Sequence, residues 1–453
     1  MVLPQAKYKR IGNRDNSHIT PKVINFFGLN QSPTLSPGEI KSMLNCSSDN
    51  YPCVSNRSPR TASVASVTTP NGIFSTNGKL CYVDGTSFIY DGVSKVTVTS
   101  DAKSIVDFNG TILIFPDKKF YTYGTNTAGT IGTGTYPTAG SCPDMDYICT
   151  YQNRVFGCKG NVIYASKFED YTNWTTFAVE DTDAVKLSVY SAGSFTGITS
   201  YSGHVVLFKS DFIYELYGDV PSNFTVKLVA KKGCIDGRSI CEVNGSLFFL
   251  AKDGFNIYNG GIPRLISKNL NEIYTNASAE TDGSKYYVCL YNNTSYILYV
   301  YDTFNGVWHK EDVLRIVGFT YLDGYLYSLT NETTSRILKF RYGTETITGS
   351  FETEIFDETE LTKKYYSKIR AKMELPSSTS VTVSVSCDGG AYSQLGSAIT
   401  TAGLQSVPLE FIPKRCNNFQ IKFDFVITAT AISIPLKVYG IEREFVLASD
   451  STA

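Results

Sequence analysis

Residue types that commonly carry catalysis or bind metals are scarce in this chain of 453 residues. Its three histidines, His18, His204 and His309, have no neighbours at the spacings typical of metal binding or nucleophile activation. The sequence also lacks a Gly-X-Ser-X-Gly elbow, a phosphate-binding glycine-rich loop with its lysine, and a His-Glu-X-X-His motif. We therefore expect no catalytic residue, no cofactor and no metal site, and we interpret the chain as a protein that is not an enzyme.

Paired carboxylates need a separate check, because glycoside hydrolases place two acids roughly 5 to 10 Å apart. The acids in predicted loops that come into question are Asp144, Asp146, Asp181 and Asp183. Acids are common in the loops of any β-rich protein, and the sequence has no sialidase-type Asp box. Hydrolysis is therefore the minor alternative.

The 11 cysteines do not form a zinc pattern. Three pairs are each separated by seven residues, whereas a zinc site needs closer pairs and usually histidine. Cys81, Cys158 and Cys289 lie within apolar runs, where cysteine behaves as a small hydrophobic residue. We expect mainly buried free thiols, with disulfides as the alternative, and the odd total favours synthesis in a reducing cytoplasm.

The most pronounced charge pattern lies in the C-terminal quarter, where acids are followed by bases. If residues 367–373 form a strand, its three bases share one face and Ile369, Ala371 and Met373 share the other. An acidic edge beside a basic face suits head-to-tail contacts between subunits. The alternative is an ordinary solvated face whose acids and bases pair within one subunit. The candidate interface residues are Glu352, Glu354, Glu358, Lys368, Arg370 and Lys372.

A repeated pair of hairpins dominates the sequence between residues 77 and 340. Each copy consists of a turn, a short apolar strand, a second turn and a short aromatic strand. Asn-Gly and Asp-Gly are strong hairpin signals, because both central residues of such turns take positive φ. The first turns of the seven copies are Asn77-Gly78, Asn109-Gly110, Asn153-Arg154, Ser202-Gly203, Asn244-Gly245, Asp282-Gly283 and Asp323-Gly324.

The copies recur about every 40 residues, which is the length of a four-stranded propeller blade. We therefore predict an all-β chain: an extended N-terminal arm over residues 1–60, a six- or seven-bladed β-propeller over 61–345, and a small antiparallel β-sandwich over 346–453. The arm is predicted from its many prolines and turns, and the sandwich from alternating strands after the repeat ends. A large irregular sandwich built from the same hairpins is the alternative.

Net charge and hydropathy argue against two kinds of partner, nucleic acid and a membrane. The net charge of −1 argues against tight, salt-driven binding of nucleic acid over the whole surface. No stretch of 18 apolar residues is present, so we expect no membrane span, and the N-terminus does not resemble a signal peptide.

Several motifs, taken in order, give the chain a family resemblance. Residues 164–174 begin with Tyr-Ala-Ser and end with Asn-Trp; turns cluster at Pro37-Gly38-Glu39 and Tyr51-Pro52; and the C-terminal part contains Asp388-Gly389-Gly390. In this order the chain resembles bacteriophage tail and neck propellers, including the nozzle, or packaged-DNA stabilisation, proteins of short-tailed phages. Lys167 departs from the pattern, since an acid is common there. The resemblance covers nearly the whole chain.

The resemblance implies a virion structural protein that is made in the host bacterial cytoplasm. Such a protein forms a ring, often of six copies, below the portal or adaptor protein and beside other tail proteins. It continues the DNA channel and helps retain the packaged DNA, which passes without sequence-specific binding.

Two other classes stay open. A glycan- or receptor-binding propeller of a tail or cell-surface assembly would display exposed aromatic residues on the loops of one face, and Tyr136 and Trp174 are the candidate exposed contacts. An interaction scaffold in the cytosol would be a monomer without ring contacts.

Overall fold

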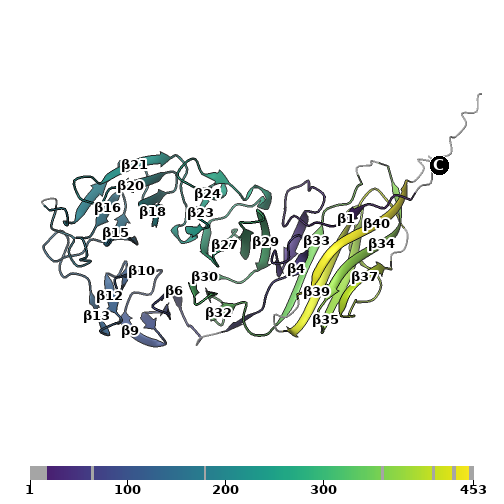
Figure 1. Cartoon of the computed structure of the whole chain (residues 1–453), viewed down its shortest axis with the longest axis horizontal. Helices are drawn as coiled ribbons and strands as arrows, with labels where there is room; N and C mark the ends of the chain where they lie inside the picture. The colour runs from purple at the N-terminus through teal and green to yellow at the C-terminus, as the bar shows by residue number, and fades with distance from the viewer. Residues whose placement is uncertain are drawn as a thin grey trace, which may run out of the picture.

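The computed structural model describes residues 18–62, 66–177, 180–358, 362–410, 414–430 and 435–447. Nearly all regular structure in these ranges is β-strand, with two short 3-10 helices, η1 (Gly237–Ser239) and η2 (Lys268–Leu270). The chain forms a ring of small sheets and, beside it, a pair of larger sheets (Figure 1). The predicted all-β fold, a propeller followed by a sandwich, is confirmed.

The ring is a seven-bladed β-propeller, and every blade is a four-stranded antiparallel sheet. Six blades use four strands that are consecutive in the chain. The first three consist of β6 (Pro70–Thr76), β7 (Lys79–Asp84), β8 (Ser87–Tyr90), β9 (Val93–Thr97); β10 (Ser104–Phe108), β11 (Thr111–Phe115), β12 (Lys119–Thr122), β13 (Thr127–Thr130); and β14 (Tyr147–Tyr151), β15 (Arg154–Lys159), β16 (Val162–Ala165), β17 (Val185–Ser188). The next three consist of β18 (Phe195–Tyr201), β19 (His204–Lys209), β20 (Ile213–Tyr217), β21 (Thr225–Ala230); β22 (Cys241–Val243), β23 (Ser246–Ala251), β24 (Gly254–Tyr258), β25 (Arg264–Leu265); and β26 (Asn276–Thr281), β27 (Lys285–Tyr291), β28 (Tyr296–Asp302), β29 (Val307–Asp312).

The seventh blade closes the ring with a strand from the other end of the chain. It consists of β30 (Ile316–Leu322), β31 (Tyr325–Thr330), β32 (Ile337–Phe340) and β5 (Arg60–Ala62). β5 pairs antiparallel with β32, with Thr61 opposite Lys339. The third strand of the last blade is thus paired on both sides, and the blade is completed by a strand from the start of the chain.

The repeat seen in the sequence corresponds to the second and third strands of each blade. Six of the seven first turns have two consecutive residues with positive φ, as hairpins of this kind require. The sixth turn has positive φ only at Gly283. In the third blade the turn residues are Gln152 and Asn153, one position before the predicted pair.

The two larger sheets form the sandwich. One has the strand order β3-β4-β40-β34-β37, with β1 added to β40 and β38 added to β34, and the other has the order β2-β33-β39-β35-β36. Their bounds are β1 (Lys22–Val23), β2 (Ile40–Leu44), β3 (Cys46–Ser47), β4 (Val54–Asn56), β33 (Glu345–Thr353), β34 (Lys364–Leu375), β35 (Thr379–Cys387), β36 (Ser393–Gln394), β37 (Gly403–Leu409), β38 (Lys414–Cys416), β39 (Phe419–Thr430) and β40 (Lys437–Leu447). Alternate residues of these strands, such as Met373, Val383 and Phe423, fill the core between the sheets.

The described part of the predicted N-terminal arm, residues 18–62, is extended, but it pairs with its own chain. β1 to β4 join the two sandwich sheets and β5 joins the propeller. The sandwich is therefore built from both ends of the chain and not from residues 346–453 alone. Residues 1–17 of the predicted arm lie outside the described ranges.

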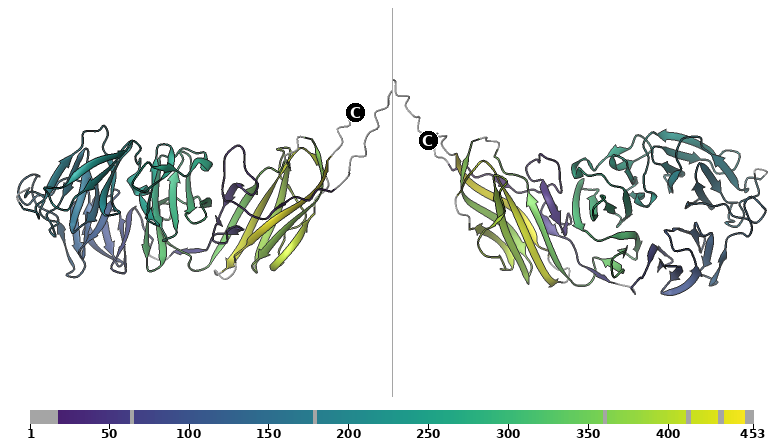
Figure 2. Two further views of the ribbon diagram at one scale, coloured as in Figure 1. Left: turned by 45° about the horizontal axis from the view of Figure 1, so that its top comes forward. Right: turned by 180° about the vertical axis from the view of Figure 1, so that it is seen from behind.

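The N-terminal strands also join the propeller to the sandwich, which lies beside the ring next to β29 (Figures 1 and 2). The Leu29 amide donates to the Trp308 carbonyl at 2.7 Å, and the Asn45 amide donates to the Glu311 carbonyl at 2.8 Å. The ring of Phe26 packs edge-on against that of Phe351, with centroids 6.5 Å apart. A continuous apolar core runs from the fifth and sixth blades through this segment into the sandwich. We call this contact the joint.

Candidate functional site

The three bases predicted to share one strand face do so on β34. Lys368, Arg370 and Lys372 are exposed. Ile369, Ala371 and Met373 between them are at most 1% exposed and belong to the sandwich core. The predicted alternation is confirmed, and it places a row of cations on the outer surface of one sheet.

The acids predicted to lie beside these bases are found elsewhere. Glu352 is on β33, in the other sheet, and it faces outward because its neighbour Phe351 faces the core. Glu354 is buried, accepts a hydrogen bond from the Gly38 amide at 3.2 Å, and has a pKa that burial raises. Glu358 forms an ion pair with Arg443 at 2.8 Å. The acids therefore do not form one exposed edge beside the bases, since Glu352 lies on the other sheet, Glu354 is buried, and Glu358 pairs with Arg443 of β40, the strand next to β34. The subunit interface itself stays a prediction.

The two residues predicted to be exposed loop contacts are packed instead. Trp174 is 1% exposed, and its Nε1–H donates to the Tyr171 carbonyl at 2.7 Å. Tyr136 is half-buried and packs edge-on against Tyr164, with ring centroids 5.6 Å apart. The prediction is wrong for Trp174, because the long connection between β16 and β17 places this side chain in the apolar cluster between the second and third blades.

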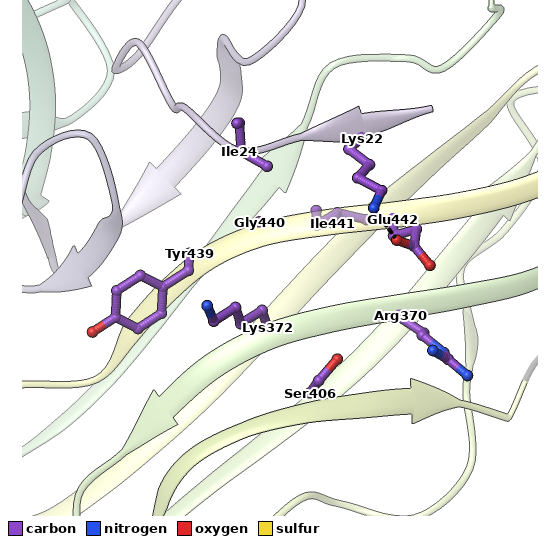
Figure 3. A pocket seen from close by; sticks show the side chains of 9 residues that line it. All are labelled: Lys22, Ile24, Arg370, Lys372, Ser406, Tyr439, Gly440, Ile441 and Glu442. Atoms are coloured by element: carbon purple, nitrogen blue, oxygen red, sulfur yellow. Dashed lines mark ion pairs between the residues drawn. The ribbon is translucent and has the colours of Figure 1, made fainter. Parts of the chain in front are cut away.

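A shallow pocket of about 260 Å³ lies on the outer surface of the sandwich, where the cationic strand face meets the N-terminal strand (Figure 3). We call it the cationic groove. It is lined by Arg370 and Lys372 of β34, Ser406 of β37, and Tyr439 and Glu442 of β40. Lys22 and Ile24 come from the N-terminal strand and the residues that follow it. Sequence reasoning found Arg370 and Lys372 but missed the others, because β34 and the N-terminal strand are more than 300 residues apart in the chain.

A glycine on β40 lets the N-terminal strand approach the groove. A Cβ atom at Gly440 would lie 2.6 Å from the Val23 carbonyl oxygen, which is closer than side-chain carbons come to such atoms. The backbone of β1 therefore packs directly on β40, with Lys22 opposite Glu442. This approach forms one wall of the cationic groove.

Only some of the cations in and beside the groove form ion pairs. The Lys22 ammonium forms an ion pair with Glu442 at 2.8 Å, and Lys368 next to the groove pairs with Glu444 at 3.3 Å. Arg370 is directly opposite Glu442 across the strand pair, but that carboxylate is occupied by Lys22. Neither Arg370 nor Lys372 forms an ion pair with a carboxylate of the described residues. The groove thus presents two cations that form no ion pair within the described part of the chain.

Apolar and aromatic groups surround these cations. Ile24 is 66% exposed beside the groove, and Leu404 at the start of β37 is 61% exposed. The Lys372 ammonium lies 5.7 Å from the centroid of the Tyr439 ring. The Tyr439 hydroxyl donates to Glu374 at 2.7 Å, and this hydrogen bond raises its pKa to about 12, so the phenol is neutral and fixed in place. Such a surface suits a carboxylate that is carried next to apolar side chains.

The remaining titratable groups that the sequence singled out lie in separate places. Asp144 pairs with Lys118 at 2.5 Å, and Asp146 pairs with Lys159 at 3.5 Å. His204 contacts Glu215 at 3.0 Å in the fourth blade, and His309 contacts Glu311 at 3.4 Å at the joint. Among the described residues, no three His, Cys, Asp or Glu side chains lie close enough together to hold a metal ion.

A second cavity, of about 680 Å³, lies where the inner strands of the second to fifth blades begin. Its charged lining is internally paired: Lys103 contacts Asp101, and Arg238 forms an ion pair with Asp236 at 2.7 Å.

All eleven cysteines are free, and nine of them are buried, so the expectation of buried free thiols is confirmed. No helix in the described ranges is long and apolar enough to cross a membrane.

Comparisons with known proteins give fold likeness only. No protein-family model matches the chain, and no curated protein matches it. Among solved structures it is similar to PorZ of Porphyromonas gingivalis, a bacterial surface component of the type-IX secretion system, with 11% identity and a TM-score of 0.41 over 61% of this chain and 39% of that chain. A putative exported protein of Bacteroides fragilis has 12% identity and a TM-score of 0.37 over 62% of this chain and 94% of that chain. Hsv2 of Kluyveromyces lactis has 15% identity and a TM-score of 0.35 over 52% of this chain and 74% of that chain. The chain thus spans well under half of PorZ, and its assignment as a seven-bladed propeller with a sandwich rests on its own strand pairing.

Proposed function

We propose that the chain is a structural subunit of a bacteriophage tail or neck. In this proposal six copies form a ring below the portal or adaptor protein, continue the DNA channel and help retain the packaged DNA. The observation that carries the proposal is the cationic groove, in which Arg370 and Lys372 form no ion pair with any carboxylate of the residues that the structure describes. The family resemblance of the sequence motifs supports the choice of a virion over other assemblies.

The joint supports a mechanical rather than a catalytic role. Arg60 of β5 is buried between Glu311 and Asp312 of β29, and it contacts both carboxylates. Arg57 forms an ion pair with Glu345 at the start of β33 at 2.9 Å. These contacts, together with the continuous apolar core, hold the propeller and the sandwich as one body. A subunit of this kind transmits a contact made by its sandwich to the position of its propeller.

The occupant that fits the groove is an acidic segment of a neighbouring copy. Two unpaired cations flanked by exposed Ile24 and Leu404 match a surface that carries carboxylates beside apolar side chains. A heterologous contact of this kind, in which the groove meets a different patch, closes into a ring when the rotation between copies is right.

The test is the assembly state of the purified full chain across a concentration series, measured by mass photometry and negative-stain electron microscopy. We expect rings with an axial hole for the unaltered chain. The double variant Arg370→Glu with Lys372→Glu should weaken assembly at least about tenfold, since each reversed charge in a contact costs on the order of 1 kcal/mol or more.

The matched control is Lys227→Glu with Lys231→Glu, which reverses two exposed cations of the fourth blade, one on β21 and one directly after it. This control should assemble like the unaltered chain. Single particles at every concentration, or equal assembly of all three proteins, would contradict the proposal.

One observation favours a glycan- or receptor-binding propeller as the second candidate. Because the strands of each blade alternate in direction, all connections between third and fourth strands lie on one face of the ring. These connections carry exposed apolar side chains, with Ile262 92%, Phe304 93%, Phe168 38% and Phe177 39% exposed. Binding of a glycan array that is lost in Phe304→Ser would support this candidate, and no binding by the unaltered chain would exclude it for the glycans tested.

A further inference from the structure

Two of the eleven cysteines are neighbours although they belong to different sheets. Cys387 ends β35, and Cys416 ends β38, which pairs with β34 in the opposite sheet. After Cys416 the chain crosses between the sheets, and Phe419 then pairs directly with Cys387. The two cysteines thus flank the crossing point.

Hydrogen bonds hold the two segments together at this point. The Asp388 carboxylate accepts from the Asn417 amide at 2.7 Å and from the Asn418 amide at 3.1 Å. The Asp388 amide donates in turn to the Asn418 carbonyl at 3.0 Å. The residues directly after each cysteine are therefore fixed against each other, so the cysteines cannot separate without breaking this contact.

The two thiols differ in their surroundings. Burial, followed by the charge and hydrogen bond of Cys387, raises the pKa of the Cys416 thiol to about 12. Cys416 is fully buried, whereas Cys387 is half-exposed. This arrangement places a cysteine that is only partly buried beside one that is fully buried. Of the other nine cysteines only Cys53 is not buried.

We propose that Cys387 and Cys416 are a redox site that is reduced in the producing cell and closes to a disulfide when the protein meets a small-molecule disulfide. The Cys387 thiolate attacks one sulfur of the small disulfide, forms a mixed disulfide and releases one thiolate. Cys416 then loses its proton to water and attacks the Cys387 sulfur, which releases the second thiolate. Two protein thiols and one small disulfide thus become one protein disulfide and two small thiols.

The disulfide would link the two sheets of the sandwich and close a loop that contains β37, the strand that brings Ser406 to the cationic groove. Closing a loop of this length reduces the freedom of the unfolded chain. The sandwich should therefore become more stable after the protein leaves a reducing cytoplasm. That the protein meets oxidants outside the cell rests on the proposed virion role. That the two cysteines can form a disulfide does not depend on this role.

The test uses the purified full chain, reduced and then incubated with oxidised glutathione. We expect the number of free thiols to fall from eleven to nine, and the intact mass to fall by about 2 Da, which is two hydrogens. Peptide mapping should recover one cross-linked peptide that joins Cys387 to Cys416. The midpoint of thermal unfolding should rise by about 5 °C and return after reduction.

Cys387→Ser should abolish the mass change and the rise in the midpoint, while the control Cys53→Ser should retain both. Because Cys416 is fully buried, Cys416→Ser can fail to fold. The variant at the partly buried Cys387 then decides the test. A count that stays at eleven, a glutathione adduct on Cys387 that never resolves, or a cross-link through Cys53 would overturn the proposal. Assembly is measured separately under reducing conditions. Absence of the disulfide would therefore not contradict the groove contact, and absence of assembly would not contradict the disulfide.

Discussion

Gly28 shows how much the joint depends on a single small residue. Its φ of +79° lies in the left-handed region, and a Cβ atom there would lie 2.7 Å from the Trp308 carbonyl oxygen and 2.8 Å from the Val307 Cβ. The neighbouring Leu29 amide donates to that same carbonyl. A larger residue would therefore push the N-terminal segment away from β29 and break the contact that joins the two parts of the chain.

Gly28→Ala should destabilise the protein by roughly 3 kcal/mol or more, since it adds both backbone strain and a clash. The matched control is Gly78→Ala, at φ +66° with no atom within 4 Å of the added Cβ, which should cost only about 1 kcal/mol. Chemical denaturation of both variants measures the difference. Equal losses would show that the close approach to Trp308 contributes nothing.

At the residue scale the sequence predicted side-chain faces well and loop exposure poorly. The alternation on β34 follows from strand geometry alone, so the exposed bases were predictable. The burial of Trp174 and Glu354 depends on which distant segment covers each of them, and no local pattern contains that information. Arg154 was missed for the same reason. Its guanidinium is 1% exposed in the third blade and donates to the carbonyls of Ser166 and Asp183.

At the element scale the hairpins were predictable because their signals are local. Turn residues that tolerate positive φ lie next to short apolar strands in every blade, and the structure pairs those strands as expected. The N-terminal strands were not predictable, since they pair with strands that are hundreds of residues away in the chain, β5 with β32 and β1 with β40. Such pairings depend on the closed ring and on the packed sandwich, which exist only after the other strands are in place.

The turn of the third blade offers a test of the hairpin rule. Gln152 and Asn153 have φ of +44° and +53°, a conformation that costs glutamine more than asparagine or glycine. Replacing the pair by Asn-Gly, as at residues 77 and 78, should stabilise the protein by about 1 kcal/mol. The reciprocal exchange, Asn77→Gln with Gly78→Asn, should destabilise it by a similar amount. Denaturant midpoints measure both, and a loss of stability in the first variant would contradict the rule here.

At the scale of the whole molecule, the joint is a dense set of buried charges. Burial alone would raise the pKa of Glu311, but Arg60, His309 and Arg57 together lower it to about 2. Arg57 likewise lowers the pKa of Glu345, and Lys285 and Arg341 lower that of Asp49. Burial lowers the pKa of His309, which therefore resists protonation in the folded state. Burial raises the pKa of the Glu354 carboxyl near this region, so Glu354 acts in the opposite sense.

These shifts predict that acid weakens the joint. Each carboxylate with a lowered pKa stabilises the fold above its unfolded pKa, 4.5 for Glu and 3.8 for Asp. It loses that contribution as the pH falls through its lowered pKa, which is about 2 for Glu311. His309 adds a loss of stability that begins below about pH 6.5. In this range the imidazole is protonated in the unfolded chain but stays neutral in the folded chain, because burial lowers its pKa. The contribution of Glu311 alone is about 3 kcal/mol. The joint should therefore weaken gradually below pH 6.5 and most steeply below pH 4.5.

The two tryptophans of the chain allow this opening to be observed directly. Trp308 lies at the joint, where its ring packs 4.9 Å from that of Tyr301 and its Nε1–H donates to the Ile266 carbonyl. Trp174 lies in the third blade, away from these charges. In Trp174→Phe, the fluorescence of Trp308 should shift to the red between pH 4.5 and 2. In Trp308→Phe, Trp174 should shift only at lower pH, when the blades themselves unfold. If both tryptophans shift together, the propeller and the sandwich unfold as one unit, and the buried charges of the joint do not set its acid sensitivity.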